Sequence, residues 1–210
     1  MEEVLTRKRL TREESRAQTR ERLLDAAFAV FVKDGIDAAS IEEVAEAAGY
    51  SRGAFYSNFE SKDELLCAVL DREIHREGQE FEALVSAIPP ADLIGKLREY
   101  YVEMGRSEGD CAFWLGLQLY ALRNEAIRPR VAELMRKKRD HVIAQVHRVY
   151  AAIGKEPPGS AETVSLGLIS IAQGLGITRM LDPQAVSEED LPKSLETLFD
   201  QITGVGTASV

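Results

Sequence analysis

Residues 40–62, SIEEVAEAAGYSRGAFYSNFESK, decide the fold of this chain. Ser40, followed three residues later by Glu43, has the pattern of a capping box, and apolar side chains then recur at helical spacing until Gly49. Ser51 can cap a second, short helix with two phenylalanines on one side. Two short helices joined by a tight glycine turn are typical of a helix-turn-helix, which places its second helix in the DNA major groove.

A plain structural hairpin is the alternative interpretation of the same stretch. Two features favour DNA binding. The predicted exposed face of the second helix carries short hydrogen-bonding groups, and Gly53 with Ala54 leaves the start of that helix slim enough to approach bases and phosphates.

Composition limits the function further. The 210 residues have 45% hydrophobic content and a formal net charge of −9, which argues against a protein that coats nucleic acid nonspecifically. Positive charge gathers between Leu5 and Arg22, where seven basic residues outnumber three acidic ones, so any phosphate contact must be focused on a small surface. Two distant cysteines, Cys67 and Cys111, predict no disulfide framework and a reducing compartment.

No membrane association is expected from the sequence. The start, MEEVLTRKRL, lacks the apolar core of a signal peptide, and we expect a cytoplasmic protein. The apolar run from Thr163 to Leu181 approaches membrane-spanning length, but it contains Gln173, Arg179 and three glycines. We therefore predict a buried helix there.

The first helices form a small unit with its own core. Apolar residues recur at helical spacing from about Thr11 to Asp34, and this helix can pack on the two helices of the opening stretch. The sequence predicts a helix-turn-helix domain with an N-terminal arm over residues 1–60 and a ligand-binding and dimerisation domain over residues 61–210. Residues before Thr11 are either a mobile terminus or a basic arm that touches DNA.

The remaining residues predict helices only. The long helix that starts at Ser61 ends before Pro89, the next one breaks around Gly109, and residues 111–122 have the composition of a helix buried nearly all round. Further helices are predicted from about residue 128 to 153, from 161 to 181 and from 188 to 202. We interpret the basic run 136–139 as a solvated helix face rather than a nucleic-acid patch. The fold class is therefore all-α, with about nine helices.

The last two predicted helices, 161–181 and 188–202, have more apolar surface than one neighbour would cover. Gly167, Ser170 and Gly174 form a strip of small side chains that another helix can approach closely. A homodimer that contributes two helices from each subunit would cover this surface. An ordinary core within one chain is the alternative.

Residues Arg20 to Leu70 resemble the amino-terminal region of the tetracycline-repressor (TetR) family of bacterial transcription regulators. The resemblance rests on the glycine-terminated first helix, the Ile41…Val44-Ala45 pattern, Gly49, the Phe55-Tyr56…Phe59 aromatic residues and Ser61-Lys62…Leu65-Leu66. It implies an all-α homodimer with a three-helix DNA-binding unit and a regulatory bundle. It also implies DNA contacts by Ser40, Arg52, Gly53, Ala54, Tyr56, Asn58 and Lys62, with a double-stranded operator as the partner.

The resemblance further implies a small-molecule effector in the regulatory bundle. The residues on the helices that enclose ligands in relatives are Tyr101, Met104, Trp114, Gln118, His141 and Gln145. They suggest a mostly apolar site with a few polar anchors for an apolar or amphipathic molecule, although ordinary core packing explains each of them as well.

An enzyme finds little support in this sequence. It has three histidines and no metal-ligand cluster, phosphate loop or nucleophile elbow, so we expect no catalytic residues, no metal and no cofactor. The sequence predicts a dimeric, ligand-responsive transcriptional regulator, most simply a repressor of a palindromic operator. A helical adaptor or an enzyme built on a helical bundle is the alternative.

Overall fold

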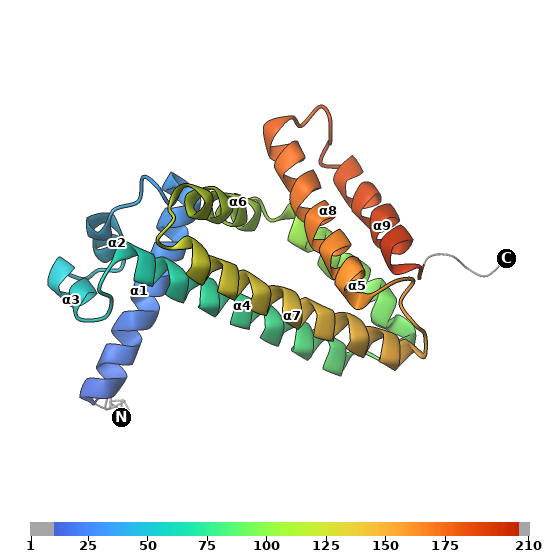
Figure 1. Cartoon of the computed structure of the whole chain (residues 1–210), viewed down its shortest axis with the longest axis horizontal. Coiled ribbons are helices and arrows are strands. Elements are labelled where there is room, and N and C mark those ends of the chain that lie inside the picture. The colour runs from blue at the N-terminus through green and yellow to red at the C-terminus, as the bar shows by residue number, and fades with distance from the viewer. Residues whose placement is uncertain (1–10, 206–210) are drawn as a thin grey trace, which may run out of the picture. The chain divides into compact units, whose positions relative to one another are not determined.

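The computed structural model describes residues 11–205, which form nine α-helices and no strand (Figure 1). The all-α prediction is thereby confirmed for the described residues, whereas the predicted N-terminal arm lies almost entirely outside them. The chain divides into two compact units, residues 1–69 and residues 70–210. The helices are α1 (Arg12–Asp34), α2 (Ile41–Ala47), α3 (Arg52–Tyr56), α4 (Lys62–Ala87), α5 (Pro90–Arg106), α6 (Glu108–Arg123), α7 (Arg128–Ile153), α8 (Ala161–Leu181) and α9 (Asp190–Thr203).

The first unit is built on helix caps and a small aromatic core. Thr11 and Glu14 form a capping box at the start of α1, and Gly35, with φ of 81°, ends that helix. Helix α1 packs on α2, and α2 packs on α3. Phe55 and Phe59 are fully buried, with ring centroids 5.7 Å apart, so these aromatic side chains belong to the core.

In the second unit, α5, α8 and α9 pack against one another around a core that includes Leu97, Leu191 and Leu195. A salt bridge from Arg98 to Asp200, at 2.7 Å, joins α5 to α9. Helix α7 packs on α8 beside them.

Helices α4 and α7 run side by side in the same direction through the second unit (Figure 1). Three ion pairs connect them: Asp71 with Lys137, Glu77 with Lys138, and Glu82 with Arg148. Ion pairs therefore contribute to the contact between α4 residues 70–87 and α7, beside apolar side chains of both helices such as Phe81 and Val149 in their shared core.

Two sequence-based expectations about α6 were wrong. The break before this helix falls at Ser107, because its hydroxyl accepts a hydrogen bond from the Asp110 amide and caps α6, which leaves Gly109 inside the first turn. The helix is also not buried all round. Gln118, Leu119 and Leu122 are exposed, and Leu122 keeps 66% of its surface, because neighbouring helices cover only one side of α6.

Helix α8 is less buried than its sequence predicted. It is the one helix among the described residues that is long and apolar enough to cross a membrane, and only 22% of its most apolar window is buried. Core helices of soluble proteins pass the same test, so the finding is weak evidence for a membrane span. Its uncovered side includes Leu166, Ser170, Gly174 and Leu181.

Candidate DNA-binding face and ligand cavities

The turn between α2 and α3 is fixed by local hydrogen bonds. The Ser40 hydroxyl accepts from the Glu43 amide at 3.2 Å, and the Glu43 carboxylate accepts from the Ser40 amide at 2.8 Å. Gly49 takes φ of 75° in the turn, a conformation that favours glycine. Ser51 then caps α3 by accepting from the Ala54 amide at 3.3 Å. The predicted helix-turn-helix is thus formed by the caps that the sequence indicated.

Arg52 and Tyr56 stand on the exposed side of α3. Tyr56 keeps 45% of its surface exposed, and the Arg52 guanidinium lies 5.5 Å from its ring centroid. The same guanidinium forms a 2.8 Å salt bridge with Glu42 on α2 and donates a 3.4 Å hydrogen bond to the Tyr56 hydroxyl. These contacts, the Tyr56 hydrogen bond foremost, raise the pKa of Arg52, so its positive charge is secure. Gly53 is exposed beside them and Ala54 is half-buried.

Two arginines of α1 hold the end of this short helix. The Arg16 guanidinium donates to the carbonyl of Ser57, and that of Arg20 donates to the carbonyl of Asn58, each at 3.1 Å. Arg20 also lies over the Phe59 ring, 4.3 Å from its centroid. Arg16 and Arg20, which the sequence analysis treated only as positive charge, therefore also position α3 against α1.

The other predicted DNA contacts, Ser40, Asn58 and Lys62, already have partners in the protein. Ser40 caps α2, and the Asn58 amide nitrogen donates to the Ala54 carbonyl at 2.8 Å. The Lys62 ammonium donates to the carbonyls of Ile36, Asp37 and Ala39 at 2.9, 3.2 and 3.0 Å. In this structure Lys62 thus joins the start of α4 to the chain segment between α1 and α2.

The second unit contains an apolar cavity of about 120 Å³. Its wall is formed mainly by aliphatic and aromatic side chains of α4, α5, α7, α8 and α9, among them Phe81, Leu97, Tyr101, Val146 and Phe199. Its polar side chains are few and stand mostly on α4 and α7. Such a lining suits an apolar or amphipathic ligand.

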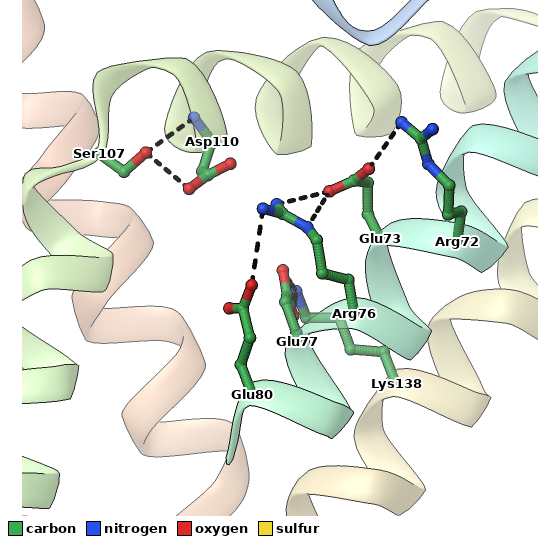
Figure 2. A network of polar contacts seen from close by, with 8 residues as sticks. All are labelled: Arg72, Glu73, Arg76, Glu77, Glu80, Ser107, Asp110 and Lys138. Carbon is green, nitrogen blue, oxygen red and sulfur yellow. Dashed lines mark hydrogen bonds and ion pairs between the residues drawn. The ribbon is translucent and has the colours of Figure 1, made fainter. Parts of the chain in front are cut away.

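A second cavity, of about 300 Å³, is polar. Carboxylates and cations from α4, α5, α6 and α7 line it, and Trp114 forms an aromatic wall. Figure 2 shows the charged network around it: the Arg76 guanidinium lies between the carboxylates of Glu73 and Glu80, at 2.6 and 3.7 Å. The Asp110 carboxylate accepts a hydrogen bond from the Ser107 hydroxyl, with 2.6 Å between the two oxygens.

Glu77 and Lys138 form an ion pair at the wall of both cavities, in which Lys138 is buried and Glu77 is partly buried. The Lys138 ammonium donates to the two carboxylate oxygens of Glu77 at 2.7 and 3.0 Å. Burial raises the pKa of Glu77 and lowers that of Lys138, while the attraction between the two groups opposes both shifts. Removing either partner would leave the other as an unpaired charge in a largely buried position.

The predicted pocket residues separate into three groups. Tyr101, Met104, His141 and Gln145 line the apolar cavity, and Met104 with Trp114 lines the polar one. Gln118 lines neither, because it lies exposed on α6 with its amide 3.5 Å from that of Gln173.

The amino-terminal unit matches known proteins closely. Residues 23–69 match the family model of the bacterial regulatory proteins of the tetR family. The transcriptional regulator AcrR of Shigella flexneri is 33% identical over 96 residues, which is 46% of this chain and 44% of AcrR. The amino-terminal unit is that of the TetR family. The matched stretches cover only 26 to 45% of the length of the curated relatives.

Solved structures of transcriptional regulators share the fold over most of this chain. A transcriptional regulator from Rhodococcus sp. Rha1 is 26% identical, covers 89% of this chain and 96% of its own, and has a TM-score of 0.66. FadR from Bacillus subtilis, solved in complex with stearoyl-CoA, has a TM-score of 0.67 at 13% identity and covers 87% of this chain and 97% of its own. The second likeness shows the fold alone.

Sequence reasoning missed Glu77 and Lys138. The basic run 136–139 was interpreted as a solvated face, which holds for Arg136, Lys137 and Arg139 and is wrong for Lys138, with only 8% of its surface exposed. A signal was present: four consecutive helical residues point in four directions, so one cation of the run had to face the interior.

Proposed function

We propose that this chain is a cytoplasmic, dimeric transcriptional regulator of the TetR family that binds a palindromic operator and is released from it by a small ligand. The observation that carries the proposal is the capped α2–turn–α3 arrangement with Arg52 and Tyr56 exposed on one face. An exposed arginine and tyrosine on a slim, capped helix are suited to contact base edges and phosphates. Repression is the simplest result of such binding.

Dimerisation supplies the second DNA-binding unit that a palindrome requires. A palindrome has two half-sites, and two recognition helices must reach successive major grooves about 34–36 Å apart. The uncovered side of α8, with Leu166 and Leu181 exposed around the small residues Ser170 and Gly174, supports a contact between two copies through α8 and α9.

The cavities of the second unit supply a ligand site, and helix α4 connects that unit to the DNA-binding unit. Helix α4 begins at Lys62, which belongs to the first unit, and its residues Glu77 and Phe81 line the apolar cavity of the second unit. A ligand that binds better to a conformation unable to span the two grooves would release DNA. Typical couplings of about 1–3 kcal/mol correspond to roughly 5–150-fold changes in affinity. FadR, which shares this fold, was solved in complex with stearoyl-CoA, and this supports ligand binding by a protein of this fold.

A gel-shift titration with DNA selected from a random pool tests sequence-specific binding by the helix-turn-helix. We expect Arg52→Ala and Tyr56→Ala each to weaken specific binding at least about tenfold, since one good base contact contributes roughly 1–3 kcal/mol. Arg130→Ala, which removes an exposed arginine from α7, is the matched control and should bind like wild type. Equal losses in all three variants, or no specific complex at moderate salt, would contradict the proposal.

A further inference from the structure

The two cavities of the second unit meet at one place. Their walls share Glu77, Tyr100, Met104, Lys138 and Ile169, so the two cavities adjoin at these side chains. One side of this junction is apolar and the other is lined by charged groups. An occupant that satisfies both sides has an apolar body and one polar head.

Charge limits what that head can be. Four carboxylates line the polar cavity, from Glu77, Glu80, Glu103 and Asp110, against two cations, from Arg76 and Lys138. Both cations are already paired with carboxylates of α4. An anionic head such as a phosphate would meet an excess of negative charge, whereas a cationic head would be attracted.

The protein itself already places an ammonium group at this junction. The Lys138 ammonium lies 3.4 Å from the centroid of the Trp114 ring and 2.7 Å from the Glu77 carboxylate. Figure 2 shows Lys138 and Glu77 next to each other among the charged side chains of α4. Trp114 is only 5% exposed, and an indole face beside a carboxylate in a desolvated place is a favourable environment for an ammonium ion. The junction is thus built to hold a cation.

We propose that the Trp114 ring and the Glu77 carboxylate form the head-group site for an amphipathic organic cation, and that Lys138 fills this site in the empty protein. The inference rests on the proposed function and names its ligand class. The ligand's ammonium replaces that of Lys138, and its apolar body occupies the apolar cavity. The carboxylates of Glu80, Glu103 and Asp110 offer the displaced lysine other partners.

This exchange also supplies a regulatory step. The Glu77–Lys138 pair is the most buried of the three ion pairs that connect α4 to α7. When a ligand takes over Glu77, α4 keeps its charge balance but loses the most buried of its three ion pairs to α7. Because α4 begins at the DNA-binding unit, loosening it from α7 changes the conformations open to that unit.

Calorimetric titration of the full chain at pH 8 with two ligands of equal tail length tests the inference. The ligands are decyltrimethylammonium and decyl sulfate, below their micelle-forming concentrations. Wild type should bind the cation at least tenfold more tightly than the anion. Fluorescence of Trp114, the single tryptophan of the chain, should change on addition of the cation. Tighter binding of decyl sulfate, or binding of neither ligand, would overturn the inference.

Substitutions at the ion pair sharpen this test. Lys138→Met removes the competing ammonium and should raise affinity for the cation about tenfold, whereas a site that uses Lys138 to anchor anions would lose affinity for decyl sulfate. The double variant Glu77→Gln/Lys138→Met should lose the gain, because the carboxylate is gone. Lower cation affinity in Lys138→Met would overturn the inference, and so would an equal gain in the double variant.

The DNA assay separates this inference from the proposed function. A specific complex that decyl sulfate dissolves and decyltrimethylammonium leaves intact would overturn the cation site and keep the regulator. Absence of any specific complex would contradict the proposed function as a regulator. The cation site would then have no regulatory role. A complex dissolved by the cation, and more readily in Lys138→Met, supports both.

Discussion

Lys62 has a contact in the structure that the sequence did not predict. The resemblance to TetR regulators implies that it meets a DNA phosphate, yet its ammonium donates to the carbonyls of Ile36, Asp37 and Ala39. We expect Lys62→Met to lower the free energy of unfolding by about 2 kcal/mol, since hydrogen bonds from a charged group contribute roughly 1.5–3 kcal/mol. Thermal unfolding followed by circular dichroism measures this.

The salt dependence of DNA binding distinguishes the two roles of Lys62. Loss of one phosphate contact per subunit would reduce the slope of log affinity against log salt by about 0.9 for each subunit. If Lys62 acts by holding α4 to the first unit, the slope of the Lys62→Met variant stays near that of wild type while its stability falls. A reduced slope with unchanged stability would restore the phosphate contact.

Single residues show where sequence reasoning succeeds and where it fails. The bond between Ser40 and Glu43 was predictable because a capping box is local and depends on a spacing of three. The burial of Lys138 was not, because its partners Glu77 and Trp114 come from other helices. The rule that charged residues lie at the surface takes no account of such pairs between different helices.

At the scale of elements, the cap of α2 makes the first unit sensitive to acid. Hydrogen bonds from the Ser40 hydroxyl and then its amide hold the pKa of Glu43 below its ordinary value of 4.5. A carboxyl whose pKa is lower when folded stabilises the protein above pH 4.5, and this stabilisation is lost as pH falls through the folded-state pKa. Glu43→Gln, which cannot ionise, should therefore melt below wild type near neutral pH.

The difference between Glu43→Gln and wild type should shrink as the pH falls through the folded-state pKa of Glu43, because the wild-type carboxyl then becomes neutral too. Melting temperatures measured from pH 3 to pH 7 follow this convergence. Glu14 in the capping box of α1 titrates in both proteins and so cancels in the comparison. A difference that stays constant with pH would mean that the Glu43 charge does not stabilise α2.

Helix boundaries were predictable where a local signal sets them. Residues 128–153 and 161–181 were predicted from their apolar spacing and their flanking proline and glycine residues, and α7 and α8 match these ranges. The break before α6 was predicted around Gly109, two residues after its position in the structure, because the cap at Ser107 was not recognised. The sides that a helix exposes depend on its neighbours, so α6 and α8 are more exposed than their composition suggested.

At the scale of the whole molecule, the cavities and their junction lay beyond sequence reasoning. The pocket residues on α5 and α7 were found because a resemblance supplied the helices that surround ligands. The prediction that Gln118 lines the pocket was wrong because composition does not tell which side of α6 faces inward. The excess of carboxylates in the polar cavity arises only when α4, α5 and α6 come together.

Assembly is the last property at this scale, and Gly174 gives the sharpest test of it. A Cβ atom at Gly174 would meet nothing within 4 Å, and this glycine lies on the uncovered side of α8 with Leu166 and Ser170. Gly174→Gln should therefore leave the fold of the single chain intact, since Gln favours a helix more than Gly does. If a second copy packs closely on this strip, the long side chain should shift the protein from dimer to monomer.

Sedimentation velocity, with circular dichroism as the check on folding, measures the effect of Gly174→Gln. Gly95→Gln on α5 is the matched control, because Gly95 is also exposed with open space around it. A monomer binds one half-site only, so the Gly174 variant should also lose affinity for a palindrome while keeping its single recognition helix. If Gly174→Gln stays dimeric and binds the palindrome as wild type does, the two copies must meet through another surface than the small-residue strip of α8.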